Sequence, residues 1–298
     1  MPEPLSAKNP RIAHLRRLSG RRRSRVDEGL FLVEGPVVVA EALAGGAPLV
    51  EVYVDAAVFD GSVAGSAIAE VVERADLAGI SVRPVTTGVL ATVTDTVTPQ
   101  GVVAIAERRL TAVDLLVGEG PVLVLAGIAD PGNAGTLVRT AEAAGAAGVV
   151  VCDGSVDPFG PKAVRAAAGS LFRLPVAEAA AGPATIAALA SLRSAGRRLV
   201  ATQARDGADP EAVDLAAPVA LVVGSEAHGL SSEVAALVDL TVSIPMSGAI
   251  ESLNAAVAGA VVLFEAARQR RHRGDSDPGA ASAKRLDVPA GNRQAHPR

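Results

Sequence analysis

The chain has 298 residues, 49% of them hydrophobic, which is enough for two packed domains, and no apolar run approaches the roughly 18 residues of a membrane span. Its single cysteine, Cys152, excludes an intramolecular disulfide and a multi-cysteine metal site, and four scattered histidines offer no metal-ligand spacing. A net charge of −4 and 2% aromatics argue against a uniformly basic protein and against recognition of single-stranded bases by stacking.

The first elements in chain order describe a small α/β domain. From about residue 30, apolar runs bounded by turn signals alternate with a helical pattern that ends at glycine. We expect strands at 30–35, 49–55, 80–85 and 101–108, and helices at 36–46 and 66–79. Residues 108–120 resemble a connector.

A second domain begins with an unbroken apolar run at 121–128, which is typical of a strand buried on both faces. Strands and helices alternate from there to the C-terminal part of the chain, which predicts a mostly parallel sheet covered by helices on both faces. We expect strands at 121–128, 149–154, 198–204, 218–224 and 240–246, and helices at 136–148, 161–169, 184–196, 231–238 and 253–271.

The charge is unevenly distributed. Residues 1–25 carry a net +7, residues 268–298 carry +5, and the middle carries −16. Basic terminal segments often bind nucleic-acid phosphate, although a solvated tail has the same composition. For the first 25 residues we favour RNA contact, through Arg21, Arg22 and Arg23 among others, because helical spacing of apolar residues accompanies the charges. The C-terminal segment, rich in Gly, Pro, Ser and Asp, is equally consistent with a disordered tail.

Three glycine-containing clusters follow strands of the second domain, where α/β sheets bind ligands. They are ADPGNAGTLVRTAEAAG (129–145), GSEAHGL (224–230) and IPMSGAIESLNAAVAGAVVLFE (244–265). Each has a structural alternative: Asn133 and Ser252 are acceptable helix caps, Arg139 could lie on a solvated helix face, and Glu226 could be an exposed loop acid. Neither GxGxxG after a strand nor GxxxxGK[ST] occurs, so a dehydrogenase or P-loop enzyme is not expected.

Together and in this order, the clusters resemble motifs 1, 2 and 3 of the SpoU (TrmH-like) group of SPOUT RNA methyltransferases. NAGTLVRTAEAAG is similar to N-x-G-x-x-x-R-x-A-x-x-x-G, GSEAHGL to G-x-E-x-x-G-[LM], and IPMSGAIESLN to I-P-M-x-G-x-x-x-S-L-N. The resemblance covers about 120–268 strongly. It covers about 26–106 more weakly, through a segment similar to the group's ribosomal-protein-like RNA-binding domain.

The resemblance implies a C-terminal trefoil knot, unusual among folds, that holds S-adenosylmethionine, and an obligate homodimer. It maps the cofactor contacts onto Gly224, Ile244, Met246 and Leu253. The apolar final helix fits burial in a partner or a core. We therefore expect an α/β chain comprising a basic arm (1–25), an RNA-binding domain (26–106), a linker (107–119), the methyltransferase domain (120–268) and a disordered tail (269–298).

The implied reaction transfers a methyl group to a ribose 2′-hydroxyl of structured RNA in the cytoplasm. The resemblance gives Arg139 the role of proton acceptor, but a guanidinium is protonated at neutral pH, so a phosphate clamp is the alternative role. Asn133 and Asn254 would orient the ribose or Arg139, Glu226 would hold the guanidinium, and Ser252 would hydrogen-bond near the nucleophile. Lys162, Arg165 and Arg173 are expected to contact RNA phosphate, with salt bridges as the alternative.

Three other functions stay open at this point. The additional N-terminal domain favours ribosomal RNA as the substrate. Transfer RNA is the alternative substrate. A non-catalytic RNA-binding assembly factor would keep the fold, although intact motifs argue against it. A small-molecule enzyme on a similar knot is disfavoured by the basic N-terminal segment.

Overall fold

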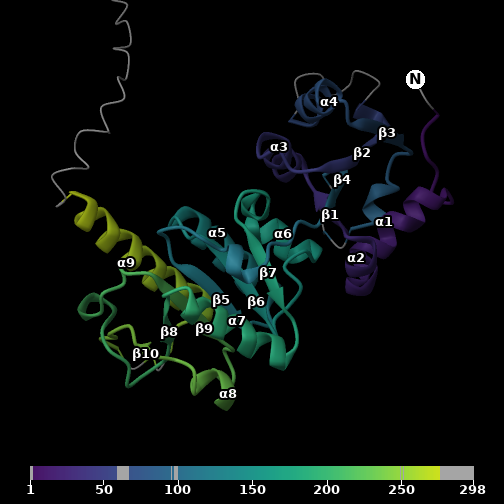
Figure 1. Cartoon of the computed structure of the whole chain (residues 1–298). Helices are drawn as coiled ribbons and strands as arrows, with labels where there is room; N and C mark the ends of the chain where they lie inside the picture. Colours follow the sequence, from purple (N-terminus) through teal and green to yellow (C-terminus); the bar gives the residue numbers. More distant parts are fainter. Residues whose placement is uncertain are drawn as a thin grey trace, which may run out of the picture.

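The computed structural model describes residues 3–58, 67–94, 96, 100–248, 250 and 252–275. These form two α/β domains joined by an extended connector (Figure 1). Within the described residues, no helix is long and apolar enough to cross a membrane. Most of the C-terminal tail predicted at 269–298 lies outside the described residues.

The N-terminal domain is built on a four-stranded mixed sheet in the order β1-β4-β2-β3. The strands are β1 (Leu30–Glu34), β2 (Leu49–Asp55), β3 (Ser81–Val85) and β4 (Val102–Glu107), close to the predicted ranges. Helices α3 (Pro36–Ala44) and α4 (Ala67–Leu77) contribute Val39, Ala42, Val71 and Ala75 to the core on one face.

The first 25 residues are not a separate arm, which corrects the expected boundary. Asn9 caps α1 (Pro10–Gly20) by accepting from the backbone N–H of Arg11, and α2 (Arg22–Glu28) follows. Ile12, Leu15 and Leu18 are fully buried against the other face of the N-terminal sheet, beside Leu32 and Tyr53. The helical spacing visible in the sequence therefore marks a core helix. The arginines between those apolar positions face solvent.

The C-terminal domain contains a six-stranded, wholly parallel sheet in the order β10-β8-β9-β5-β6-β7. The strands are β5 (Val122–Ala126), β6 (Gly148–Cys152), β7 (Val176–Ala179), β8 (Arg198–Thr202), β9 (Val219–Gly224) and β10 (Leu240–Val242). Edge strand β7 was not predicted, because its four residues lack an apolar run.

Alternating residues of each strand supply two cores, as the predicted three-layer architecture requires. Leu123 and Leu125 of β5 face α5 (Pro131–Ala143), α6 (Pro161–Ala167) and α9 (Ala255–Asp275). Val122 and Val124 face α7 (Gly182–Ser194) and α8 (Ser232–Ala235). The burial of both strand faces explains the unbroken apolar runs.

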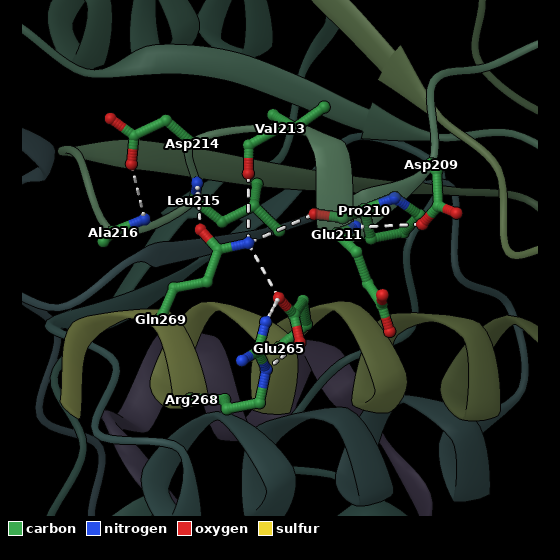
Figure 2. Close-up of polar contacts among 10 residues, drawn as sticks. All are labelled: Asp209, Pro210, Glu211, Val213, Asp214, Leu215, Ala216, Glu265, Arg268 and Gln269. Carbon is green, nitrogen blue, oxygen red and sulfur yellow. Dashed lines mark hydrogen bonds and ion pairs between the residues drawn. The ribbon is translucent and has the colours of Figure 1, made fainter. Parts of the chain in front are cut away.

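Helix α9 continues to Asp275, so residues 269–275 are helical and belong to the domain. Figure 2 shows how Gln269 binds this end of α9 to the segment before β9. Its amide nitrogen Nε2 donates to the carbonyls of Pro210 (3.2 Å) and Val213 (3.1 Å), and its Oε1 accepts from the N–H of Leu215 (2.8 Å). These bonds satisfy backbone groups of a non-repetitive segment, which would be costly to bury unpaired.

The connector between the domains is held against the C-terminal domain. The guanidinium of Arg197 donates to the carbonyls of Leu116 (3.3 Å), Gly118 (2.9 Å) and Gly120 (2.8 Å). Burial lowers the pKa of Arg197, and these carbonyl contacts offset part of the cost of burying the charge. This end of the connector is therefore fixed to the C-terminal domain.

Candidate active site

The loops that follow the C-terminal ends of β8, β9 and β10 surround a cavity of about 770 Å³. This is within the usual size of small-molecule sites in proteins. The four residues predicted to contact a cofactor, Gly224, Ile244, Met246 and Leu253, all line it, as do Glu226 and Ser252. The second and third glycine clusters thus meet in one place, although 13 residues (231–243) separate them in the chain.

A chain of side-chain amides and a carboxylate lies at this site. The Nδ2 of Asn133, at the start of α5, donates to Oε1 of Glu226 at 2.5 Å. The Nδ2 of Asn254, just before α9, donates to Oδ1 of Asn133 at 3.1 Å. Residues from all three clusters are therefore connected, with Asn133 at the centre.

The helix caps are not the ones considered from the sequence. Asp130 caps α5, since its Oδ1 accepts from the N–H of Asn133 at 2.8 Å. This backbone hydrogen bond, assisted by Lys162, lowers the pKa of the Asp130 carboxyl. Asn254 caps α9 by accepting from the N–H groups of Ala256 (2.9 Å) and Val257 (3.2 Å). The side chains of Asn133 and Ser252 are therefore not the helix caps, which corrects that structural alternative. The side-chain amide of Asn133 instead bonds to Glu226 and Asn254.

Arg139 lies two turns along α5 on an exposed face, and it is not among the residues that line the cavity. It makes no hydrogen bond or ion pair with the described residues of its own chain, so the expected contact with Glu226 is absent there. Six residues along a helix rotate a side chain by about 240°, which separates Arg139 from the face of Asn133. In one chain, the cavity and Arg139 are separate features.

One wall of the cavity was not predicted. Thr202 ends β8, Gln203 follows it, and Thr241 lies on β10. The sequence did contain a signal, because parallel strands end at the same edge of a sheet, so the residues after β8 had to lie beside those after β9.

The three basic residues predicted downstream of the first cluster are paired with carboxylates. Arg165 Nη1 lies 2.7 Å from Oε2 of Glu34 in β1, across the domain interface. Arg173 pairs with Glu41 (2.6 Å) and also with Glu142. The salt-bridge alternative is correct for Arg165 and Arg173.

The pKa changes at Arg173 agree with this pairing. Hydrogen bonding to Glu142 raises the pKa of Arg173, and Arg173 in turn lowers that of Glu142. Lys162 differs from the other two basic residues, because it is 63% exposed in its side chain and lies 3.3 Å from Asp130 in a loose pair.

Exposed positive charge gathers where α1 meets α2. Arg17, Arg21 and Arg22 are exposed and make no side-chain hydrogen bond or ion pair within the described part of the chain. Arg23 is 92% exposed in its side chain and lies 3.4 Å from Asp27, a pair too open to neutralise it firmly. We call Arg17, Arg21, Arg22 and Arg23 the basic cluster.

The cavity suits a ligand with a flat apolar part and several polar groups. Ile244, Met246 and Leu253 provide apolar contacts, and Gly224 allows the 225–230 loop to approach the end of β9 closely. A Cβ at Gly224 would lie 2.8 Å from the carbonyl carbon of Gly229 and 2.9 Å from its oxygen. Because these are backbone atoms, the 225–230 loop would have to move. The features fit the S-adenosylmethionine site that the sequence resemblance implies.

Family models and known relatives agree on the two domains. Residues 120–264 match the SpoU rRNA Methylase family, and residues 9–104 match an MRM3-like substrate binding domain. The 23S rRNA (guanosine(2553)-2′-O)-methyltransferase RlmP of Bacillus subtilis (strain 168) is 31% identical over 264 residues, covering 87% of this chain and 96% of that protein. The 23S rRNA (uridine(2479)-2′-O)-methyltransferase of Streptomyces viridochromogenes is 41% identical over 142 residues, covering 47% and 50%.

Solved structures give the same result over the whole described fold. The SpoU methyltransferase AviRb from Streptomyces viridochromogenes, in complex with AdoMet, superposes with a TM-score of 0.77 at 30% identity, covering 89% of this chain and 100% of that one. An AdoMet-bound rRNA methyltransferase from Sinorhizobium meliloti gives a TM-score of 0.75 at 32% identity, covering 90% and 97%.

Proposed function

The chain belongs to the SpoU family of S-adenosylmethionine-dependent RNA 2′-O-methyltransferases, and we propose that it methylates a ribose 2′-hydroxyl in 23S ribosomal RNA. The relatives that support this substrate are named as 23S rRNA methyltransferases, and they include one that this chain covers over 96% of its length. Transfer RNA is the less favoured substrate.

The observation that carries the proposal is that Asn133 links the three motifs, because it is hydrogen-bonded to Asn254 and to Glu226, which lines the cavity. A non-catalytic assembly factor would not need to retain this arrangement. The test incubates the purified protein and labelled S-adenosylmethionine with 23S rRNA, 16S rRNA and transfer RNA, and maps protected riboses by alkaline hydrolysis. We expect one protected position, in 23S rRNA. Label in transfer RNA alone, or none, would contradict the proposal.

The chain's own residues position the RNA ribose and assist the methyl transfer. S-adenosylmethionine supplies an electrophilic methyl group on a good leaving group. The protein must place the 2′-hydroxyl in line with it and accept or stabilise the proton and charge. We assign the orientation of the ribose to Asn133 and Asn254, whose amides Glu226 holds through Asn133. Ser252 is placed to hydrogen-bond near the hydroxyl, and Arg139 stabilises developing negative charge or clamps the adjacent phosphate.

We assign cofactor binding to the backbone and apolar groups of Gly224, Ile244, Met246 and Leu253. Gly224→Ala should raise the Kd for S-adenosylmethionine by about 10-fold or more, because overpacking costs about 1–3 kcal/mol and about 1.4 kcal/mol is a factor of ten. Calorimetric titration measures this Kd.

Gly182→Ala, at the start of α7 and outside the cavity lining, is the matched control for Gly224→Ala, since a Cβ at Gly182 meets nothing within 4 Å. The control should bind the cofactor as the wild type does. Equal affinity for Gly224→Ala and the wild type would remove Gly224 from the assigned site.

The homodimer and the knot are also proposals for this chain. Val257, Val261 and Phe264 form an exposed apolar stripe along α9, on the side away from the core. Such a stripe on a helix whose other face is buried supports a subunit contact. The path from edge strand β10 back to α9, which packs beside α5 and β9, supports a knotted C-terminal segment.

We assign RNA phosphate binding to the basic cluster. The middle of the chain carries −16, so a local positive field is needed to hold a polyanion. Replacing Arg17, Arg21 and Arg22 together with glutamine should weaken binding to all RNA sequences, because phosphate contacts position without specifying. Each lost contact should flatten the log–log dependence of affinity on salt by about 0.7 to 0.9. RNA affinity measured across a salt series gives this slope.

Substitution is the appropriate test, because deleting residues 1–25 would also remove buried Ile12, Leu15 and Leu18. Arg74→Gln, which removes a partly exposed charge paired with Glu70 on α4, is the control and should change the slope little. Parallel salt lines for the triple variant and the wild type would leave Arg23 and Lys162 as the remaining candidates for phosphate contact. Cofactor affinity should be unchanged in every variant.

A further inference from the structure

The basic run that contains the cluster also turns one arginine inward. Arg25 is only 5% exposed, whereas Arg21, Arg22 and Arg23 face solvent. Its Nη1 donates to the carbonyl oxygens of Leu18 (2.7 Å) and Ser19 (3.0 Å), near the end of α1. The guanidinium therefore joins α1 to α2 at the point where the exposed arginines lie.

The same guanidinium reaches the other domain. Nε of Arg25 donates to Oδ2 of Asp157 at 2.8 Å, and Asp157, which is also 5% exposed, lies in the loop between β6 and α6. Oδ1 of Asp157 accepts from the N–H of Phe159 at 2.9 Å. The ring of Phe159 packs edge-on against Phe31 of β1, with centroids 5.0 Å apart. The ion pair is thus buried, hydrogen-bonded at both ends and set in an aromatic contact between the domains.

A buried ion pair is a poor source of stability, because desolvating two charges costs about as much as their attraction returns. The pair does fix the relative position of the two domains, because separating the charges would leave each of them buried without a partner, which is costly. Further pairs across the interface restrict the remaining motions. Arg165 pairs with Glu34, and Arg173 joins Glu41 of the N-terminal domain to Glu142 of the C-terminal domain.

The distance between the two functional surfaces makes this geometry matter. The N-terminal domain contacts α6 and the β6–α6 loop, whereas the cavity lies beyond β8, β9 and β10. In the sheet order, β6 and β8 are three strand spacings apart, and each spacing is about 4.8 Å. A rotation of the N-terminal domain about this interface would therefore change the position of the basic cluster relative to the cavity.

We propose that Arg25 and Asp157 are positioning residues, which hold the basic cluster in one orientation relative to the methyl-transfer site and so determine which ribose is presented. The proposal rests on the proposed function and extends it. The N-terminal domain would keep the bound RNA at a fixed distance and orientation from the methyl-transfer site. Arg25 does not contact the RNA in this account.

The first test is the double variant Arg25→Met with Asp157→Asn. It removes both charges together, so neither stays buried and unpaired, and the new amide oxygen can still accept from Phe159. We expect kcat/KM for 23S rRNA to fall roughly 10- to 100-fold, since small misplacements far from the chemistry can cost about 100-fold. The loss should lie mainly in KM, with additional protected riboses near the target, while the Kd for S-adenosylmethionine changes less than about twofold.

An engineered disulfide elsewhere in the domain interface can show whether Arg25 and Asp157 position the domains or only stabilise the local fold. A Cβ built at Gly45, at the end of α3, lies 3.4 Å from Cβ of Phe172 in the C-terminal domain. This separation is close to the lower end of the range of about 3.5–4.5 Å for Cβ atoms joined by a disulfide, so Gly45→Cys with Phe172→Cys should cross-link the domains. The native Cys152 is buried, and burial raises its thiol pKa to about 11, so it should not compete.

In the Arg25→Met/Asp157→Asn background, the oxidised cross-link should restore kcat/KM and the single methylated ribose, and reduction should abolish the rescue. X-ray scattering should show a broader size distribution for the double variant and its reversal on cross-linking. The cross-linked protein with Arg25 intact, and Arg74→Gln, are the controls.

Two outcomes overturn the proposal: a double variant equal to the wild type in scattering, KM and methylated position, or an impairment that the oxidised cross-link leaves unchanged. The second outcome would place Arg25 in RNA contact or in local folding. A wild-type protein that methylates no RNA would instead sink the proposed function, and the scattering measurement would still report on the positioning pair.

Discussion

Arg139→Ala should lower kcat for RNA methylation by about 100- to 1,000-fold and leave the Kd for S-adenosylmethionine nearly unchanged. Removing one group that stabilises charge in a transition state typically has an effect of about this size. The cofactor should be unaffected, because Arg139 is exposed on α5 and is not among the residues lining the cavity. Single-turnover methylation and calorimetric titration measure the two quantities.

Arg139→Lys tests what the guanidinium supplies. Lysine keeps the positive charge but loses the planar two-pronged donor, so partial activity would favour charge stabilisation and no activity would favour bidentate binding of a phosphate. Arg109→Ala removes another exposed arginine, from the connector, and should behave as the wild type does. If Arg139→Ala lost cofactor binding and activity to the same extent, its assigned role would be wrong.

The sequence predicted the architecture well, because local patterns report burial directly. Strands buried on both faces appear as unbroken apolar runs, and the loops after them could be placed at one sheet edge without knowing the strand order. The meeting of Gly224, Ile244 and Leu253 at the cavity follows from that rule.

Long-range pairings were not predictable in the same way. Arg165 and Arg173 were expected to face RNA, and their carboxylate partners, Glu34 and Glu41, lie more than 100 residues away in the other domain. The charge of a residue is visible in a sequence, but the carboxylate that neutralises it is visible only in the fold. For the same reason, nothing in the run of arginines distinguished buried Arg25 from its exposed neighbours.

The spacing at Ile12, Leu15 and Leu18 was recognised, but the helix was assigned to a separate basic arm. The density of arginine around these residues favoured that interpretation, yet three apolar residues on one helical face can cover a sheet while the charges point outward. Amphipathic spacing therefore carried more information about location than net charge did.

A substitution on helix α9 should also have a large effect on activity. Phe264→Asp should convert a dimer into a monomer and abolish methylation. Val257, Val261 and Phe264 are spaced by four and three residues, which places them on one face of α9, and they are 49%, 43% and 49% exposed in the single chain. A carboxylate at this position would be buried without a partner in a dimer, at a cost of several kcal/mol.

The single chain should tolerate Phe264→Asp, because the side chain is half exposed there and α9 remains anchored by Gln269 and by Leu263 in the core. Its melting temperature, extrapolated to low concentration, should therefore stay near that of the wild type. Activity should still be lost, since Arg139 does not line its own cavity and is exposed on α5, the helix that packs beside α9. A subunit contact there would bring a second chain close to Arg139.

Val37→Asp provides the matched control for Phe264→Asp, because Val37 is 66% exposed on α3, a helix of the other domain. Light scattering at micromolar concentration should give a dimer for the wild type and for Val37→Asp, and a monomer for Phe264→Asp. Methylation of 23S rRNA should follow the dimer content. A wild-type monomer that is fully active, or an active monomeric Phe264→Asp protein, would show that one chain is sufficient and that Arg139 reaches the reacting ribose within its own subunit.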